Sequence, residues 1–239
     1  MTQKTERAMI AVVMAGGLGS RMRPLTYTIP KPLLPIGEKP ILEIILQKLK
    51  TAGFGKVFIT TNYQSELVRS YFGRGARFGV ELEYTEESEA LGTAGPLFLL
   101  KGRIAEPFLV MNCDVLTKLD LGALYRFHLE KGADMTVAAA CYDVQVPYGV
   151  LELDGDSVKG VVEKPRTSHL VLAGMYVLNP EILGMREPVK TDVPDLIRAL
   201  VAGGKRVAFY EVKEPWIDVG RMADYERATN EFRKWEESQ

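Results

Sequence analysis

The sequence predicts an α/β fold built on one mainly parallel sheet with helices on its faces. First, short apolar runs alternate with helical patterns up to about residue 131, and parallel strands need such crossover connections. Second, the apolar run at residues 10–14 leads into a glycine-rich turn, as a buried strand would. Third, 239 residues with 46% hydrophobic content are enough for one sizeable core.

The elements of the first half follow from local signals. Pro40 stands before a dense apolar helical face that stops near Gly53. Ser65 is a candidate cap for the next helix. The expected elements are strands at 10–14, 57–61, 80–84 and 108–111, and helices at 41–49, 65–72, 96–100 and 121–131.

The second half is richer in strands. No repeat and no Gly-, Ser- or Pro-rich linker interrupts the chain. We therefore expect one continuous domain over residues 1–239. Its expected elements are strands at 135–140, 150–153, 158–163, 174–178 and 207–211, and helices at 193–202 and 222–235.

Composition narrows the class of function. A formal net charge of −1 provides no overall field to attract nucleic acid or an anionic membrane. Cys113 and Cys141 lie in apolar runs and fit no metal-ligand spacing, so neither a disulfide scaffold nor a zinc site is expected. No apolar run reaches the roughly 18 residues of a membrane span. We expect a soluble cytoplasmic protein.

A glycine-rich turn follows the first strand. Gly16, Gly17 and Gly19 would let backbone N–H groups approach an anion, and phosphate is the expected ligand. Met22 stands where a dinucleotide-binding motif has its third glycine, and no P-loop signature follows. Arg21 comes next, and a proline-stiffened run holds Lys31. The alternative is a plain strand-to-loop connection with solvated charges.

Two acids stand in apolar surroundings. Asp114 follows the strand at 108–111, and Asp218 lies in Trp216-Ile217-Asp218-Val219-Gly220. Two such carboxylates can hold one Mg²⁺ and leave its other positions to water and phosphate oxygens. The alternative is that each caps the start of a turn or helix.

A pair of charged residues lies at the end of the strand at 158–163. Glu163 offers an acceptor for sugar hydroxyls and Lys164 a point charge for a phosphate, although the pair taken without context favours an exposed strand end. His128 and His169 show no catalytic spacing, and we expect both to be structural or solvent-facing. The absence of a nucleophile motif disfavours covalent serine or cysteine catalysis.

Taken together, these motifs resemble the sugar-1-phosphate nucleotidyltransferase (NDP-sugar pyrophosphorylase) family from residue 10 to about residue 232. The matching stretches are residues 15–26 (AGGLGSRMRPLT), 30–35 (PKPLLP), 91–97 (LGTAGPL), 112–114 (NCD), 147–150 (PYGV), 163–165 (EKP), 173–176 (AGMY) and 216–220 (WIDVG). The resemblance implies a single Rossmann-like mixed sheet, with a nucleotide-binding half at about 10–131 and a sugar-phosphate-binding half at about 132–232. Because the chain ends near Gln239, we expect no appended β-helix or acyltransferase domain of the kind that some relatives carry.

The resemblance also implies roles for individual residues. Arg21, Lys31, Asp114 and Lys164 would be the catalytic residues, and Asp114 and Asp218 would hold Mg²⁺. The nucleotide would be bound by Ala15, Gly16, Gly17, Gly19, Arg21, Lys31, Gly92 and Thr93. The sugar phosphate would be bound by Asn112, Gly149, Glu163, Lys164 and Gly174.

The implied reaction is attack of a sugar-1-phosphate oxygen on the α-phosphorus of an NTP, with release of pyrophosphate. The stretch at 91–97 resembles guanylyltransferases more than thymidylyltransferases, so GTP is favoured. The same reaction with UTP or dTTP, or a non-catalytic NDP-sugar-binding module, remains an alternative. Leu172 stands where many members carry a sugar-contacting Asn. The implied partners are the two substrates, and a homo-oligomer is compatible with the pattern.

Overall fold

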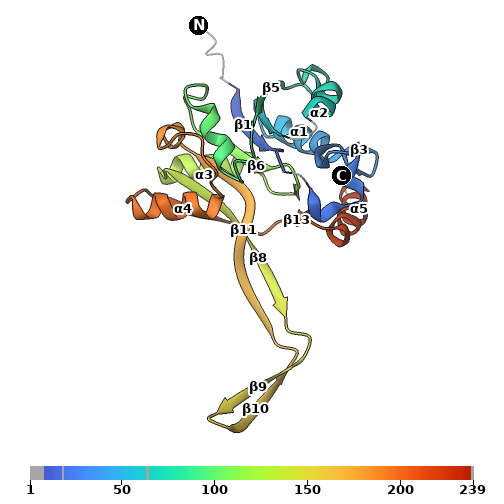
Figure 1. Ribbon diagram of the computed structural model, residues 1–239, viewed down its shortest axis with the longest axis vertical. Coiled ribbons are helices and arrows are strands. Elements are labelled where there is room, and N and C mark those ends of the chain that lie inside the picture. Colours follow the sequence, from blue (N-terminus) through green and yellow to red (C-terminus); the bar gives the residue numbers. More distant parts are fainter. Residues whose placement is uncertain (1–7, 18, 63–64, 238–239) are drawn as a thin grey trace.

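A computed structural model of the chain describes residues 8–17, 19–62 and 65–237. Its centre is a seven-stranded sheet in the order β12-β8-β11-β6-β1-β4-β5 (Figure 1). Only β11 of these seven strands runs opposite to its neighbours, so the sheet is mixed and mainly parallel, as predicted. The seven strands are β1 (Met9–Met14), β4 (Phe54–Thr61), β5 (Glu81–Glu86), β6 (Phe108–Asn112), β8 (Met135–Gln145), β11 (Arg166–Leu178) and β12 (Val207–Val212).

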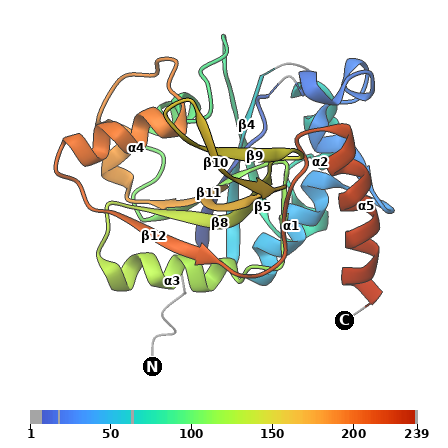
Figure 2. The same ribbon diagram turned by 90° about the horizontal axis from the view of Figure 1, so that it is seen from below.

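Helices and three small strand pairs surround this sheet. Helices α1 and α5 lie on the opposite side of the molecule from α4 (Figure 2). No helix in the described part of the chain is long and apolar enough to cross a membrane. The helices are α1 (Ile41–Thr51), α2 (Ser65–Phe72), α3 (Leu121–Lys131), α4 (Val193–Ala202) and α5 (Met222–Glu237). The small strand pairs are β2 (Pro35–Ile36) with β3 (Lys39–Pro40), β7 (Val115–Thr117) with β13 (Trp216–Asp218), and β9 (Gly149–Asp154) with β10 (Ser157–Glu163).

The sheet has an apolar core on each face. Strand β1 supplies both, because successive side chains of a strand point to opposite faces. Ala11 and Val13 join the core that contains α1, whereas Ile10 and Val12 join the core that contains α4. A strand buried on both faces reads as a continuous apolar run, which explains why this one was predictable.

Several predicted elements differ from the structure in detail or extent. The helix predicted at 96–100 is a 3-10 helix (Gly95–Leu100). Pro40 occupies the N-cap position directly before α1 and makes no side-chain cap hydrogen bond. The strands predicted at 135–140 and 174–178 extend to 135–145 and 166–178. Their extra residues are mostly exposed and carry no buried-strand pattern, so apolar runs alone ended the first strand too early and began the second too late.

The extra residues of β8 and β11 form a projecting ribbon together with the hairpin between them. We call residues 141–170 the arm. They pair without interruption from Leu172 opposite Ala139 to Arg166 opposite Gln145, and the β9–β10 hairpin extends this ribbon. Figure 1 shows the arm projecting far from the rest of the chain, which we call the body.

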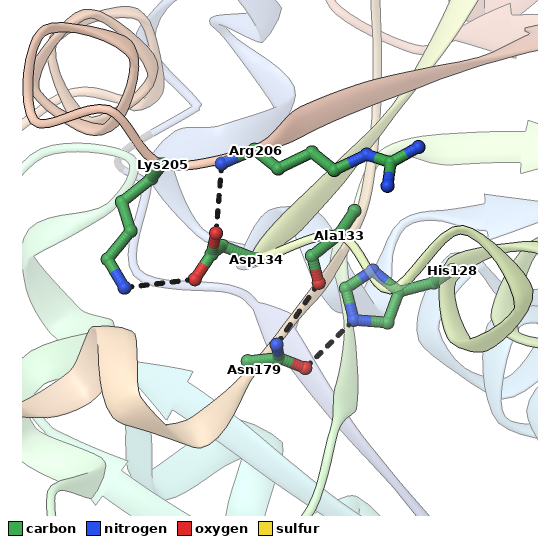
Figure 3. A network of polar contacts seen from close by, with 6 residues as sticks. All are labelled: His128, Ala133, Asp134, Asn179, Lys205 and Arg206. Carbon is green, nitrogen blue, oxygen red and sulfur yellow. Dashed lines mark hydrogen bonds and ion pairs between the residues drawn. The ribbon is translucent and has the colours of Figure 1, made fainter.

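At the end of the body opposite the arm, a polar network connects α3, the end of β11 and the residues directly before β12 (Figure 3). The ring of the buried His128 lies 3.0 Å from Asn179 Oδ1 and 2.9 Å from Thr136 Oγ1. Asp134 accepts from Lys205 Nζ at 3.1 Å and from the Arg206 backbone N–H at 2.9 Å. Burial lowers the pKa of His128. This histidine is structural, as predicted.

Candidate active site

A cavity of about 440 Å³ lies at the carboxyl edge of β1, β4 and β6. Parallel sheets bind ligands at this edge, because several strands deliver loop residues to one place there. The residues that line the cavity include Gly16, Gly17, Gly19, Arg21, Lys31, Asn62, Glu87, Gly92, Thr93, Asn112, Asp114 and Asp218. The structure therefore gathers most of the predicted nucleotide and metal residues around one space.

The glycine turn forms the first wall. A Cβ on Gly16 would lie 2.2 Å from Glu87 Oε1, so no larger residue fits there without displacing that carboxylate. Gly19 has a φ of +59°, and a Cβ would lie 2.9 Å from Thr26 Cγ2. Ala15 is buried below the turn and donates its N–H to Thr60 O at 2.9 Å. Leu18 lies outside the described residues.

Lys31 supplies a buried cation to the opposite wall. It begins a short 3-10 helix (Lys31–Leu33) between Pro30 and Pro32, which restrict the backbone there. Its side chain is 9% exposed, and Nζ lies 2.5 Å from Asp114 Oδ2. A partly buried charge-assisted contact of this kind is strong, so it fixes both groups in place.

Asp114 and Asp218 lie close together because two short strands pair. Strand β13 runs antiparallel to β7, which sets Asp218 opposite Val115, and Val219 N–H donates to Asp114 O at 2.9 Å. Burial raises the pKa of Asp218, and the charge of Asp114 adds to that rise. Both residues line the cavity, and neither Oδ1 accepts a backbone N–H as the oxygen of a helix cap would.

One oxygen of each acid is unsatisfied. Asp114 Oδ1 and Asp218 Oδ1 are buried and have no hydrogen-bond partner. An unpaired buried carboxylate oxygen is costly, and a hard divalent cation is the partner that such oxygens suit. No group of three or more possible ligand side chains exists in the described part of the chain. The pair therefore fits a cation such as Mg²⁺ whose other ligands are water and substrate phosphate.

The neighbouring Cys113 takes no part in such chemistry. Its thiol is buried beneath the two acids, and burial raises its pKa to about 12. A thiolate is the nucleophilic form of cysteine, so this residue is unreactive near neutral pH. The prediction against covalent cysteine catalysis agrees with this environment.

A second recess of about 170 Å³ adjoins the cavity and shares Thr93, Asn112 and Asp218 with it. Gly174 lines it with a φ of +71°, and a Cβ there would lie 2.9 Å from Asn112 Nδ2. Leu172 contributes an apolar wall. This recess is an additional space for a substrate beside the two acids.

Thr93 forms hydrogen bonds that hold the same wall in place. Its N–H and its hydroxyl lie 3.0 and 3.1 Å from Asp192 Oδ1, and its hydroxyl oxygen accepts the Val193 N–H at 2.9 Å. These contacts tie the loop at 91–94 to the start of α4. The loop next to Gly92 is therefore rigidly placed at the cavity.

Three predicted sugar-phosphate residues lie elsewhere. Gly149, Glu163 and Lys164 sit on the arm, where the β9–β10 hairpin joins the ribbon, and none of them lines the cavity or the recess. Lys164 has a φ of +47°, and its Nζ lies 3.8 Å from Glu163 Oε1. The structure thus brings together the predicted nucleotide side but not the whole predicted sugar side.

Glu87 is a cavity residue that sequence analysis missed. It stands in the acidic run Glu86-Glu87-Ser88-Glu89, which is typical of a solvated loop. It is nevertheless 6% exposed, and its Oε2 accepts the Leu91 N–H at 3.0 Å. Burial raises its pKa. The available signal was its place directly after β5, which is parallel to the strands that build the site.

Residues 10–234 match the nucleotidyl transferase family. The chain belongs to this family. Among curated relatives of the chain, a probable mannose-1-phosphate guanylyltransferase 1 of Oryza sativa subsp. japonica is 33% identical over 226 aligned residues, with 91% of this chain and 63% of that protein covered. The catalytic subunit beta of a Danio rerio mannose-1-phosphate guanylyltransferase is 34% identical over 225 residues, with 91% and 62% covered. The chain thus spans about 63% of the length of such relatives.

Solved structures share the fold of the chain. HddC from Yersinia pseudotuberculosis complexed with GMP-PN is 26% identical, with a TM-score of 0.72 over 94% of this chain and 99% of that one. A putative glucose-1-phosphate thymidylyltransferase from Bacillus anthracis is 24% identical, with a TM-score of 0.77 over 93% and 94% of the two chains. The predicted family and fold class are both confirmed.

Proposed function

We propose that this nucleotidyl transferase joins a nucleoside triphosphate, preferably GTP, to a sugar-1-phosphate and releases pyrophosphate. The observation that carries the proposal is the pair of buried, unpartnered oxygens of Asp114 and Asp218 in one cavity with a glycine turn and Lys31. The names of the curated relatives support a guanylyl donor and a phosphorylated sugar.

In the proposed reaction, an oxygen of the sugar phosphate forms a bond to the α-phosphorus, and the bond from that phosphorus to the bridging oxygen breaks. Pyrophosphate leaves with the electron pair. No protein nucleophile is needed, and no general base is needed because a phosphate monoester is ionised at neutral pH. The protein has to hold two anions in line against their repulsion.

Different residues of the chain are proposed to bind the triphosphate, the sugar phosphate and the cation. The glycine turn is the proposed cradle for the triphosphate, with Arg21 and Lys31 as its cations. Glu163 and Lys164 are the proposed contacts of the sugar and its phosphate. Asp114 and Asp218 are the proposed ligands of Mg²⁺, which would supply neutralisation of phosphate charge when bound.

Glu87 supports the preference for guanine. Guanine presents two neighbouring donors, its ring N1–H and its 2-amino group, and an ionised carboxylate accepts both. Uracil and thymine present one N–H between two carbonyl oxygens, which a carboxylate repels. A buried acceptor-only group at the cavity therefore suits guanine better than a pyrimidine.

The test is a matrix of nucleotides and sugars. The purified protein would be incubated with Mg²⁺, each of GTP, ATP, UTP and dTTP, and a panel of sugar-1-phosphates, and pyrophosphate would be measured. We expect release with GTP and at least one sugar phosphate. Asp218→Ala should abolish it, whereas Asp195→Ala, which removes an exposed carboxylate paired with Arg198, should not. Folded protein that releases no pyrophosphate with any pair would refute the proposal, and binding of NDP-sugar without turnover would identify a regulatory module.

A further inference from the structure

The recess beside the two acids contains no cation of its own. Its described lining includes Asn112, Gly174, Trp216 and Asp218, and no lysine or arginine among them. In the adjoining cavity, Lys31 already contacts Asp114. Arg21 lines only that cavity, so apart from the proposed Mg²⁺, which the triphosphate shares, no charge of the recess lining offsets the repulsion between the Asp218 carboxylate and a sugar phosphate bound there. The site requires a cation from another element.

The arm carries the predicted cation but holds it away from its own recess. Leu172 lines the recess, and the ribbon is paired without interruption from Leu172 to Arg166. Six residue steps at about 3.3 Å each place Arg166 about 20 Å farther along the ribbon. Lys164 lies beyond that point. Lys164 can reach the recess in the body of the same chain only if the ribbon unpairs or folds back.

The arm also exposes an unusual amount of apolar surface. Eleven of the twenty-one large hydrophobic side chains that are exposed in the described part of the chain lie within residues 141–170. A two-stranded ribbon is at best marginally stable by itself, and contiguous apolar surface of this kind is typical of an interface. The arm therefore requires a covering surface.

One face of the hairpin links the apolar surface to the polar pair. Leu151 lies opposite Val161, Leu153 opposite Val158, and Gly149 opposite Glu163, and directly opposed residues share a face of an antiparallel pair. A Cβ on Gly149 would lie 3.1 Å from Glu163 Oε2 and 3.3 Å from Val161 Cγ1, so both side chains are on that face. Whatever covers these apolar residues also receives Glu163.

From this geometry we propose that two copies of the chain exchange arms. Each arm lays this hairpin face against the body of the second copy and places Glu163 and Lys164 at that copy's recess. The inference rests on the proposed function for the role of these two residues. A second copy is the occupant because its body contains the same recess, whose described lining lacks a lysine or arginine and to which the Glu163–Lys164 pair would supply one. A two-fold dimer satisfies both copies with the same contact.

Mixing two inactive variants tests the exchange. Asp218→Ala disables the body but leaves an intact arm, and Lys164→Met disables the arm but leaves an intact body. Equal mixing, after dilution and reconcentration to exchange chains, gives half mixed dimers with one complete site each, so about a quarter of wild-type activity per chain should return. If each arm serves its own body, mixing restores nothing, and the proposal is overturned.

A measurement of mass separates this inference from the proposed function. Light scattering on the eluting wild-type protein should give twice the chain mass of 26.6 kDa, and Val161→Glu should halve it. Val201→Glu on α4 is the matched control, because both valines are 59% exposed, and it should remain a dimer. A monomeric wild type, or a Val161→Glu dimer, would overturn the exchange. If the wild type and the two valine variants have the expected masses but the wild type shows no turnover, only the proposed catalytic function is refuted.

Discussion

Glu87→Gln should remove the preference for guanine without harming the fold. The carboxylate keeps lone pairs beyond the one that accepts the Leu91 N–H, so it can accept from guanine as well. Glutamine turns one of the two oxygens into a donor, which then meets a donor of the base. The substitution is nearly isosteric, so Gly16 still fits against it.

The expected loss follows from the bond that is removed. A hydrogen bond to a charged group contributes about 1.5–3 kcal/mol, and the donor left facing a donor adds a penalty of similar origin. A total of about 3 kcal/mol corresponds to roughly a 10²-fold fall in kcat/KM for GTP. Thermal stability should be unchanged or higher, because the substitution removes a buried carboxyl group whose charge is unfavourable.

Steady-state rates with three nucleotides make the comparison specific. ITP lacks the 2-amino group of guanine but keeps N1–H, so wild type should use it less well than GTP. In Glu87→Gln the gap between GTP and ITP should shrink, and UTP should gain relative to GTP. A GTP rate within threefold of wild type, or an equal fall for every nucleotide, would show that Glu87 does not contact the base.

The pH dependence gives an independent check. Burial raises the pKa of Glu87 above its ordinary value, so the carboxyl becomes protonated at a higher pH than an exposed glutamate does. Protonation removes an acceptor. The KM for GTP should therefore rise as pH falls from neutral in wild type, and the same rise should be absent from Glu87→Gln.

Four further substitutions have defined outcomes. Asp218→Ala should lower kcat at least about 10²-fold in pyrophosphate release, as loss of a ligand at a charge-neutralising site does. Lys31→Met should also slow turnover, because Asp114 loses its partner. His128→Gln should flatten the pH dependence of urea unfolding: the wild-type pKa is lowered by burial, so stability falls as pH drops below about 6.5, the ordinary histidine value. Gly174→Ala should lower the melting temperature and activity together, since its φ is +71° and a Cβ would crowd Asn112.

Sequence patterns located the acids but not their relationship. Asp114 was predictable because it follows an apolar strand, and Asp218 because it lies in an apolar frame. Their proximity depends on the pairing of β13 with β7, two strands of three residues separated by about a hundred positions. No local periodicity encodes such a pairing, and capping explained each acid equally well until the pairing was known.

The arm and Glu87 escaped prediction for opposite physical reasons. Glu87 looks solvated in its acidic run but is buried, because β5 ends at the cavity and its Oε2 is held by a backbone N–H. The hairpin residues 150–153 and 158–163 look buried in their apolar runs but are mostly exposed, because no element in the described part of the chain covers them. Both contrasts arise from tertiary surroundings, which override local hydropathy.

The unsatisfied groups of the body indicate what each part of the site binds. The unpartnered oxygens of Asp114 and Asp218 need a cation, the buried carboxylate of Glu87 needs donors, and the recess next to Leu172 needs a positive charge. Each costs stability in the free protein and is relieved only by a ligand or a second chain. Substrates and an exchanged arm should therefore stabilise the same body, and adding a nucleotide together with a sugar phosphate should raise the melting temperature of wild type more than that of Lys164→Met.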